Sequence, residues 1–372
     1  MKKVNGHEII TLFEQWVPKR YAEDWDPVGL HIGQLNRPVE KVVVTLDVND
    51  AVVAEAIENG ANLIIAHHPP IFKPMKFLWT DTPQGRLIET CIKNDIAVYA
   101  AHTNLDVAPG GVNDLLADRL ELTNTLVMEP TIHDPLYKLA VFCPVDHADR
   151  LRDALAKAGA GAIGDYVGCS FTSTGTGRFI PAEGADPFIG EIGKSEEVPE
   201  ERIEVVMPGT LRTKVLKAML AVHPYEEPAY DFFVLDQRTN ELGLGRVGEL
   251  RESMSLAQFA DHVKRTLEVP VVRIVGDLDK PIRKVAVLGG SGHKYIQSAK
   301  RKGADVFVTG DMDYHTAQDA ENIDLAIVDP GHHVEKVMIS GVADYMQKLC
   351  AEKNLDVTFI PSTIHTEPFR FG

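Results

Sequence analysis

The chain has 372 residues, of which 44% are hydrophobic and 25% are charged, as expected for a globular protein with more than one hydrophobic core. Its formal net charge of -16 argues against the phosphate backbone of a nucleic acid as the main partner. The four cysteines are scattered, which suits a reducing compartment and offers no cysteine-ligated zinc. Because we find neither an apolar signal core nor a run of about 18 apolar residues, we expect a cytoplasmic protein without membrane insertion.

The first 128 residues alternate strand and helix patterns, which is typical of parallel βαβ units. An amphipathic N-terminal helix is followed by a turn-rich segment, 24–33, whose glycines suggest close backbone approach, with a connecting loop as the alternative interpretation. Strands are predicted at 41–46, 62–66 and 96–101, and helices at 49–59 and 83–93. Gly60 stands where a helix C-cap favours glycine.

The pattern changes between residues 129 and 240, where we predict an inserted α+β domain. Its predicted strands are 137–143, 169–176, 177–179, 202–207 and 229–235, and its predicted helices are 145–158 and 211–221. Two strand–helix–strand halves of this length indicate a ferredoxin-like module. The βαβ pattern then resumes over 241–372, with predicted strands at 271–275, 284–288, 304–309, 324–328 and 356–360. Its predicted helices are 255–267, 294–302, 314–321 and a long one that ends near residue 353.

Two adjacent histidines, His67 and His68, end the apolar strand 62–66 and are followed by two prolines. In a mainly parallel sheet, ligands gather at the carboxyl ends of strands, so these imidazoles are candidate metal ligands. The alternative interpretation is a polar turn in which one histidine caps a backbone group.

Two further strand ends carry potential ligands. His102 and Asp106 follow strand 96–101, and the segment His332, His333 and Glu335 follows strand 324–328. At a helix start, residues three apart share a face, which favours His332 over His333 as the partner of Glu335. Three imidazoles and two carboxylates exceed what one tetrahedral structural zinc needs, so they indicate two divalent ions bridged by a carboxylate. Zinc, manganese and iron all suit this mixed set of ligands.

Several motifs together resemble the Nif-three-like proteins, also labelled the GTP cyclohydrolase I type 2 family. The motifs are the Ala-His-His-Pro-Pro strand end at 66–70, the segment 102–106, the turn 24–30, and Gly331-His332 with Glu335. The resemblance covers 1–128 and 241–372. The insertion resembles the PII/CutA-like module of longer bacterial members through the motif 223–228. This motif is equally well interpreted as a proline-fixed turn with surface carboxylates.

The resemblance implies an α/β core of two related halves around a dinuclear metal site, and a toroidal homohexamer. It implies two divalent ions per chain, with zinc preferred and manganese or iron as alternatives. The implied ligands are His67, His68, Asp106, His332 and Glu335, with Glu335 as the bridge. Some members separate the last pair by four residues rather than three, so the choice between His332 and His333 stays open.

Two functions follow as hypotheses. The first is a metal-dependent hydrolase that acts on a nucleotide, by opening the GTP imidazole ring at C8, or on a phosphoester. In it His102 and His315 move protons, and the run Gly289–Gly292 lies near phosphates, although an orienting role, helix capping and a tight turn explain these residues as well. His365 is a weaker candidate. The second is a non-enzymatic regulator that senses metal or nucleotide through the PII-like insertion. Nucleic-acid binding inside a ring would need a basic lining.

Overall fold

The computed structural model describes residues 4–132, 134–238 and 241–371, which form two compact units. Unit 1 contains the described residues up to Thr131 and from Leu242 onward, and unit 2 is Ile132–Glu241. The predicted end of the insertion, at residue 240, lies outside the described residues. Among the described helices, each is too short or too polar to traverse a lipid bilayer. The cytoplasmic location stays a prediction.

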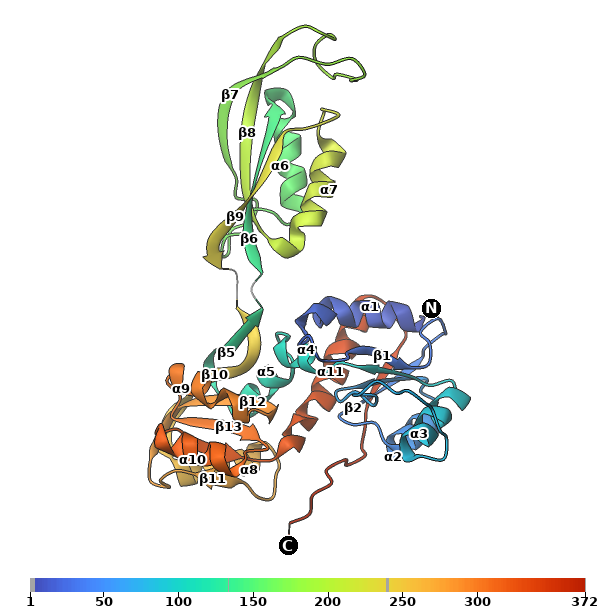
Figure 1. Ribbon diagram of the computed structural model, residues 1–372, viewed down its shortest axis with the longest axis vertical. Helices are drawn as coiled ribbons and strands as arrows, with labels where there is room; N and C mark the ends of the chain where they lie inside the picture. The colour runs from blue at the N-terminus through green and yellow to red at the C-terminus, as the bar shows by residue number, and fades with distance from the viewer. Residues whose placement is uncertain (1–3, 133, 239–240, 372) are drawn as a thin grey trace. The chain divides into compact units, whose positions relative to one another are not determined.

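The first sheet of unit 1 has the strand order β1-β4-β3-β2-β15 (Figure 1). Its strands are β1 (Gly29–Ile32), β2 (Lys41–Thr45), β3 (Leu63–Ala66), β4 (Ala97–Ala100) and β15 (Thr358–Pro361). Strands β2, β3, β4 and β15 run parallel, as predicted, and β1 runs antiparallel to β4. The alternative interpretation of 24–33 as a connecting loop was therefore wrong for residues 29–32, whereas the expected close backbone approach is seen at Gly33, where a Cβ atom would lie 2.8 Å from the carbonyl oxygen of Ile96. Strand β1 is short and two of its four residues are not buried, so it has little hydrophobic pattern.

The helices in the first part of unit 1 include α2, whose two ends are set by capping residues. They are α1 (Gly6–Trp16), the 3₁₀ turn η1 (Lys19–Tyr21), α2 (Asp50–Asn59), α3 (Pro83–Lys93), α4 (Thr103–Val107) and α5 (Val112–Arg119). Helix α2 begins after Asn49, whose side chain accepts a hydrogen bond from the amide of Val52. It ends at Gly60, whose φ of 68° is readily adopted by glycine, as predicted.

The second sheet of unit 1 has the order β11-β14-β13-β12-β10-β5. Its strands are β5 (Thr123–Ile132), β10 (Leu242–Ser255), β11 (Arg273–Val275), β12 (Pro281–Ser291), β13 (Val306–Gly310) and β14 (Ala326–Asp329). The central strands β12, β13 and β14 are parallel, whereas β10 pairs antiparallel with β12, and β11 with β14. Strands β5 and β10 were not predicted. Glycines at 243, 245 and 248 lower the strand propensity of β10, and its pairing with β12 compensates.

A common core joins the two sheets of unit 1. It includes Val44 and Ile65 from the first sheet, Val287 and Val308 from the second, and Met338 from α11. The other helices of this half are α8 (Leu256–Thr266), α9 (Ile296–Arg301), α10 (Tyr314–Asn322) and α11 (Val337–Glu352), with 3₁₀ turns η4 (His293–Tyr295) and η5 (His332–Lys336). Helices α5 and α11 lie between the two sheets (Figure 1). This packing fixes the positions of the strand ends of the two sheets relative to each other.

Unit 2 is an antiparallel sheet of order β7-β8-β6-β9 with two helices on one face (Figure 1). Its elements are β6 (Pro135–Pro144), η2 (Val145–His147), α6 (Ala148–Lys157), β7 (Phe171–Phe179), β8 (Glu196–Pro208), η3 (Gly209–Leu211), α7 (Arg212–Val222) and β9 (Tyr230–Arg238). This is the ferredoxin-like order. The strands predicted separately at 169–176 and 177–179 are one strand, β7. Leu139, Ile203, Leu151 and Val215 belong to a core of this unit's own.

Candidate metal centre

His67 and His68 follow β3 directly, and each ring is held by a different partner. His67 is buried, and its Nδ1 lies 2.8 Å from the carbonyl oxygen of Ala101. Because a carbonyl only accepts, Nδ1 carries the proton and Nε2 of a neutral ring is left with a free lone pair. The His68 Nδ1 lies 2.7 Å from Asp47 Oδ1, and its Nε2 lies 3.1 Å from Glu335 Oε2. Both Nε2 atoms are thus oriented as metal ligands require.

Asp106 and His102 come from the segment after β4. Asp106 is buried in α4, and its backbone carbonyl accepts a 2.9 Å hydrogen bond from the Asn113 side chain. Asn113 in turn accepts from the amide of Gly289 at 2.9 Å, which connects α4 to the second sheet. The His102 Nδ1 lies 2.9 Å from Asp26 Oδ1, so this carboxylate orients the His102 ring.

His332 and Glu335 lie in η5, directly after β14. The His332 Nε2 is 3.2 Å from Glu335 Oε2, and its Nδ1 is 2.7 Å from Asp311 Oδ2. His333 is directed elsewhere: its Nε2 lies 3.3 Å from Thr366 Oγ1, and its ring centroid is 4.8 Å from that of His365. The structure therefore brings His332, rather than His333, to Glu335.

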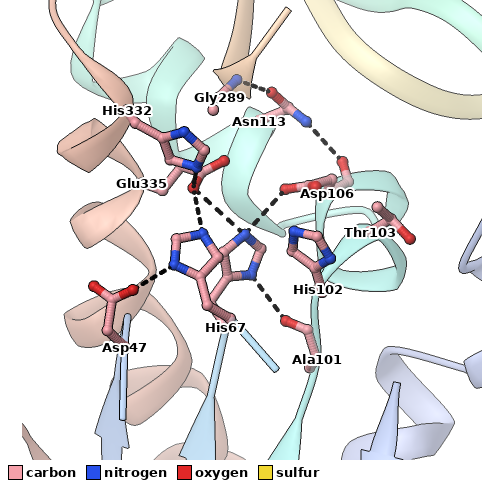
Figure 2. A network of polar contacts seen from close by, with 12 residues as sticks. Asp47, His67, Ala101, His102, Thr103, Asp106, Asn113, Gly289, His332 and Glu335 are labelled. Carbon is pink, nitrogen blue, oxygen red and sulfur yellow. Dashed lines mark hydrogen bonds and ion pairs between the residues drawn. The ribbon is translucent and has the colours of Figure 1, made fainter. Parts of the chain in front are cut away.

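These side chains converge into one cluster (Figure 2). Their ligand atoms lie within 4.8 Å of one another in three groups: His67, Asp106 and Glu335; His68, His332 and Glu335; and His67, His68 and His102. Glu335 belongs to the first two groups. Together the groups are suited to a divalent metal ion.

Two buried atoms of the cluster lack a hydrogen-bond partner, and this supports a metal site. The His67 Nε2 lies 3.7 Å from Asp106 Oδ1 and 3.7 Å from Glu335 Oε2. Neither His67 Nε2 nor Asp106 Oδ1 has a hydrogen-bond partner. Buried polar atoms are normally paired, and three facing lone-pair donors are satisfied by a cation among them. The residues present therefore fit a divalent ion.

The charges of the cluster perturb one another strongly. Although burial opposes the change, hydrogen bonds to Asp47 and Glu335 raise the pKa of His68 to about 10. The Glu335 hydrogen bond raises the pKa of His332 to about 9. Burial and the charge of Glu335 raise the pKa of the Asp106 carboxyl. The facing imidazoles lower the pKa of Glu335 well below its usual value, against the effect of burial. Without a metal ion, protons on His68 and His332 offset the negative charge of Glu335.

The glycines at the end of β12 serve the cluster by their small size. A Cβ atom at Gly290 would lie 2.5 Å from Glu335 Oε1, and one at Gly289 would lie 3.1 Å from the same atom. The amides of Gly289 and Gly292 already donate to Asn113 and Thr309. The run does not open a helix directly, because β12 continues to Ser291 and pairs there with Gly310. The phosphate-binding role of the run stays a prediction.

Other predicted residues lie apart from the cluster, and the carboxylates that orient its imidazoles were missed, among them Asp47. His315 is exposed in the first turn of α10, and it belongs to none of the three groups found among the described residues. Its catalytic role stays a prediction. Asp47, which orients His68, was not predicted. It follows β2 at the same sheet edge as His67, and that position was the available signal.

The fold and the cluster define a mixed α/β protein with histidine and carboxylate groups suited to binding a metal ion. The family model of Duf34/NIF3 (NGG1p interacting factor 3) matches residues 4–368. The chain belongs to this family, which confirms the resemblance seen in the sequence.

Relatives match along the whole chain. A Bacillus subtilis protein named GTP cyclohydrolase 1 type 2 homolog is 55% identical over 370 residues, covering 100% of this chain and 99% of its own. The crystal structure of a Bacillus cereus protein related to NIF3 is 55% identical, with a TM-score of 0.95 and full coverage of both chains. A Staphylococcus aureus protein of known structure is 34% identical, with a TM-score of 0.82, and the match covers 100% of this chain and 99% of that one.

Proposed function

We propose that this chain is a metal-dependent hydrolase with two divalent ions at the cluster. His67, Asp106 and Glu335 would hold one ion, and His68, His332 and Glu335 the other. The observation that carries the proposal is the position of Glu335 Oε2, which lies 3.1 Å from His68 Nε2, 3.2 Å from His332 Nε2 and 3.7 Å from His67 Nε2. A carboxylate that faces three imidazoles would help to hold both ions. Zinc is the preferred ion, with manganese and iron as alternatives.

The bound ions would supply Lewis acidity and a lowered pKa for water at the site. The protein's own groups would orient the ligands and move protons. His102 is fixed through Nδ1 by Asp26, which leaves its Nε2 to exchange a proton with a substrate. Asp47 and Asp311 accept hydrogen bonds from Nδ1 of His68 and His332, respectively. Each ring is thereby fixed with its Nε2 directed into the cluster.

Two aromatic side chains beside His102 support a substrate with a planar ring. The Trp25 ring centroid lies 6.0 Å from that of His102, and the Phe72 centroid lies 6.4 Å from it. The two rings also pack against each other, with centroids 6.0 Å apart, and both side chains stay exposed enough to offer aromatic surface to a base. Together with the relatives' name, this favours GTP as substrate, with hydrolysis at C8 of its imidazole ring. A phosphoester is the alternative, because two ions stabilise attacking and leaving oxygens alike.

Elemental analysis and turnover test this proposal together. We expect about two ions per chain in the wild type purified without chelator, and a large loss in Glu335→Gln. The loaded chain is then incubated with GTP and with bis(p-nitrophenyl) phosphate, and products are separated by chromatography. Metal binding without turnover of either compound would leave a metal site but exclude these substrates. A chain that binds no zinc, manganese or iron would overturn the mechanism.

A regulator acting through unit 2 is the second candidate. We propose that unit 2 is the PII/CutA-like module suggested by the motif 223–228; its ferredoxin-like strand order and its own hydrophobic core support this. Replacing Ile132–Glu241 with a short glycine-serine linker discriminates the two functions. A hydrolase of unit 1 keeps most of its turnover, whereas a sensor loses its response to metal or nucleotide.

We also propose that the chain assembles as a toroidal homohexamer. The family resemblance motivates this assembly, and exposed apolar side chains of unit 1, such as Phe77 and Trp79, are compatible with buried interfaces. Analytical ultracentrifugation of the full chain tests it. Six chains per particle are expected, and a monomer at micromolar concentration would contradict the proposal.

A further inference from the structure

Unit 2 contains a pocket of about 640 Å³ whose lining residues all belong to that unit. It is formed by the facing parts of β6, β7 and β8, the β7–β8 loop, and the segment before β9. Pockets of about 300–1,000 Å³ accommodate small organic molecules. The size of the pocket therefore suits a ligand larger than a simple ion.

The pocket lies where β7 and β8 extend beyond the end of β6, whose pairing with β8 stops at Glu200. The strand pairing of β6, β7 and β8 puts Phe142, Gly177 and Glu200 on one face. Val141 and Ile203 point to the opposite face, into the core with α6 and α7. A Cβ atom at Gly177 would lie 2.3 Å from Glu200 Oε2, so glycine at this position leaves room for the carboxylate. The site is thus open to the β7–β8 loop rather than to the core.

Aromatic rings form the apolar wall of the pocket. The Tyr225 ring centroid lies 6.0 Å from that of Phe179 and 6.5 Å from that of Phe188. Phe188, on the β7–β8 loop, is 52% exposed despite these contacts. An aromatic ring that is only partly covered can pack against a bound apolar group or a cation.

The polar lining is mainly acidic. Glu200 is 8% exposed and accepts a 2.8 Å hydrogen bond from the Tyr225 hydroxyl. Three more acidic residues line the pocket, Asp186, Glu226 and Glu227, and the Glu226 carboxylate accepts a 3.0 Å hydrogen bond from the Asp186 amide. Arg178 also lines it, but its Nε donates to Glu197 at 2.8 Å, which offsets its charge. This excess of negative charge disfavours a phosphate or a carboxylate ligand and favours a cation.

We propose that this pocket binds a small organic cation with an apolar body. Its ammonium or guanidinium group would face Glu200, and its body would pack against Tyr225 and Phe188. The buried carboxylate supplies the charge that a desolvated cation needs, and the aromatic faces supply further attraction. The proposal concerns unit 2 alone and does not depend on the metal centre.

Three probes of similar shape and different charge test whether the pocket prefers a cation. Tryptamine is a cation, tryptophol is its neutral counterpart and indole-3-acetate is an anion. Each is titrated into the full-length protein by calorimetry. We expect tryptamine to bind at least tenfold more tightly than tryptophol, and indole-3-acetate to bind most weakly. Equal affinities for tryptamine and tryptophol, no binding of tryptamine, or tighter binding of the anion would overturn the proposal.

Variants then locate the site. Glu200→Gln should weaken tryptamine binding at least tenfold and remove the preference over tryptophol. Phe188→Ala, at a half-exposed loop position that should tolerate the change, should weaken both ligands severalfold and decides the question if Glu200→Gln does not fold. The control is Asp153→Asn, which removes one charge from an exposed position on α6. Equal effects of Asp153→Asn and Glu200→Gln, or none from Phe188→Ala, would contradict binding in this pocket.

Discussion

The Nε2 atom of His67 and the Oδ1 atom of Asp106 lie 3.7 Å apart in the interior of unit 1, and neither has a hydrogen-bond partner. The Nδ1 proton of His67 is committed to the carbonyl of Ala101, so the neutral ring offers Asp106 no proton. Burying two lone-pair donors face to face is unfavourable unless a cation or a proton lies between them. This relationship indicates that the fold is shaped for an occupied site.

The choice between two adjacent histidines is directly testable. We expect His332→Ala to lower the metal content of the chain from about two ions to about one. His333→Ala should retain the wild-type content, because its ring faces Thr366 and His365 rather than Glu335. Elemental analysis of the two variants, purified side by side, makes the comparison. A loss confined to His333→Ala would reverse the assignment.

Asp47 orients a proposed ligand without belonging to any of the three groups of ligand atoms. Removing such a partner typically weakens metal binding by about 10–100-fold, so we expect a loss of this size in Asp47→Asn. Competition with a chromogenic chelator measures it. Glu58→Gln, which removes an exposed carboxylate on α2, is the control and should bind metal like the wild type. Equal affinities in all three proteins would exclude a role for Asp47.

The metal-free chain should lose stability as pH rises. The pKa of His68 is raised to about 10 and that of His332 to about 9, from a usual 6.5. A raised pKa stabilises the folded state fully below pH 6.5, and that contribution is lost as pH rises through about 9 to 10. With chelator, Tm should therefore fall between pH 7 and pH 10.

The same protons compete with a metal ion for the imidazoles. Affinity for a divalent ion should rise with pH over the same range, and binding should release protons. Calorimetry in buffers of different ionisation enthalpy counts the protons released. If metal binding releases no protons and Tm does not fall with pH, the imidazoles are neutral at pH 7 and the expected competition does not occur.

Gly290 offers a test of crowding at the proposed bridge. Its φ is 62°, and Gly60, in a cap with open space around it, has a φ of 68°. Alanine at either position should cost roughly 1 kcal/mol from backbone strain. Only Gly290→Ala should also displace Glu335 and lower the metal content, because its Cβ would lie 2.5 Å from Oε1. Equal metal contents in the two variants would show that Glu335 adjusts freely.

Stacking by Trp25 should affect substrate binding rather than metal binding. If a base stacks there, Trp25→Ala should raise the KM for GTP by roughly tenfold, since stacking contributes about 1–3 kcal/mol per base. The metal content should not change. Phe171→Ala is the control, because it removes an exposed aromatic ring from β7 of unit 2. An unchanged KM in Trp25→Ala would remove this aromatic rim from the substrate site.

Much of unit 1 was predictable because its signals are local. Apolar β-branched runs predicted β2, β3 and β13, and a polar cap followed by a glycine predicted both ends of α2. His67 and His68 could be found because an imidazole directly after a buried strand lies at the sheet edge where ligands gather. Several such motifs in order were enough to recognise the family.

The sequence by itself therefore determined the mixed α/β class, the family and a small set of candidate ligands. Only the tertiary structure decided that Glu335 meets imidazoles from two sheets, that Asp47 and Asp311 hold two of them, and that β10 forms a strand despite its glycines. The physical reason is that these features depend on hydrogen bonds and packing between segments far apart in the chain. Such contacts leave no periodic pattern of their own in the sequence.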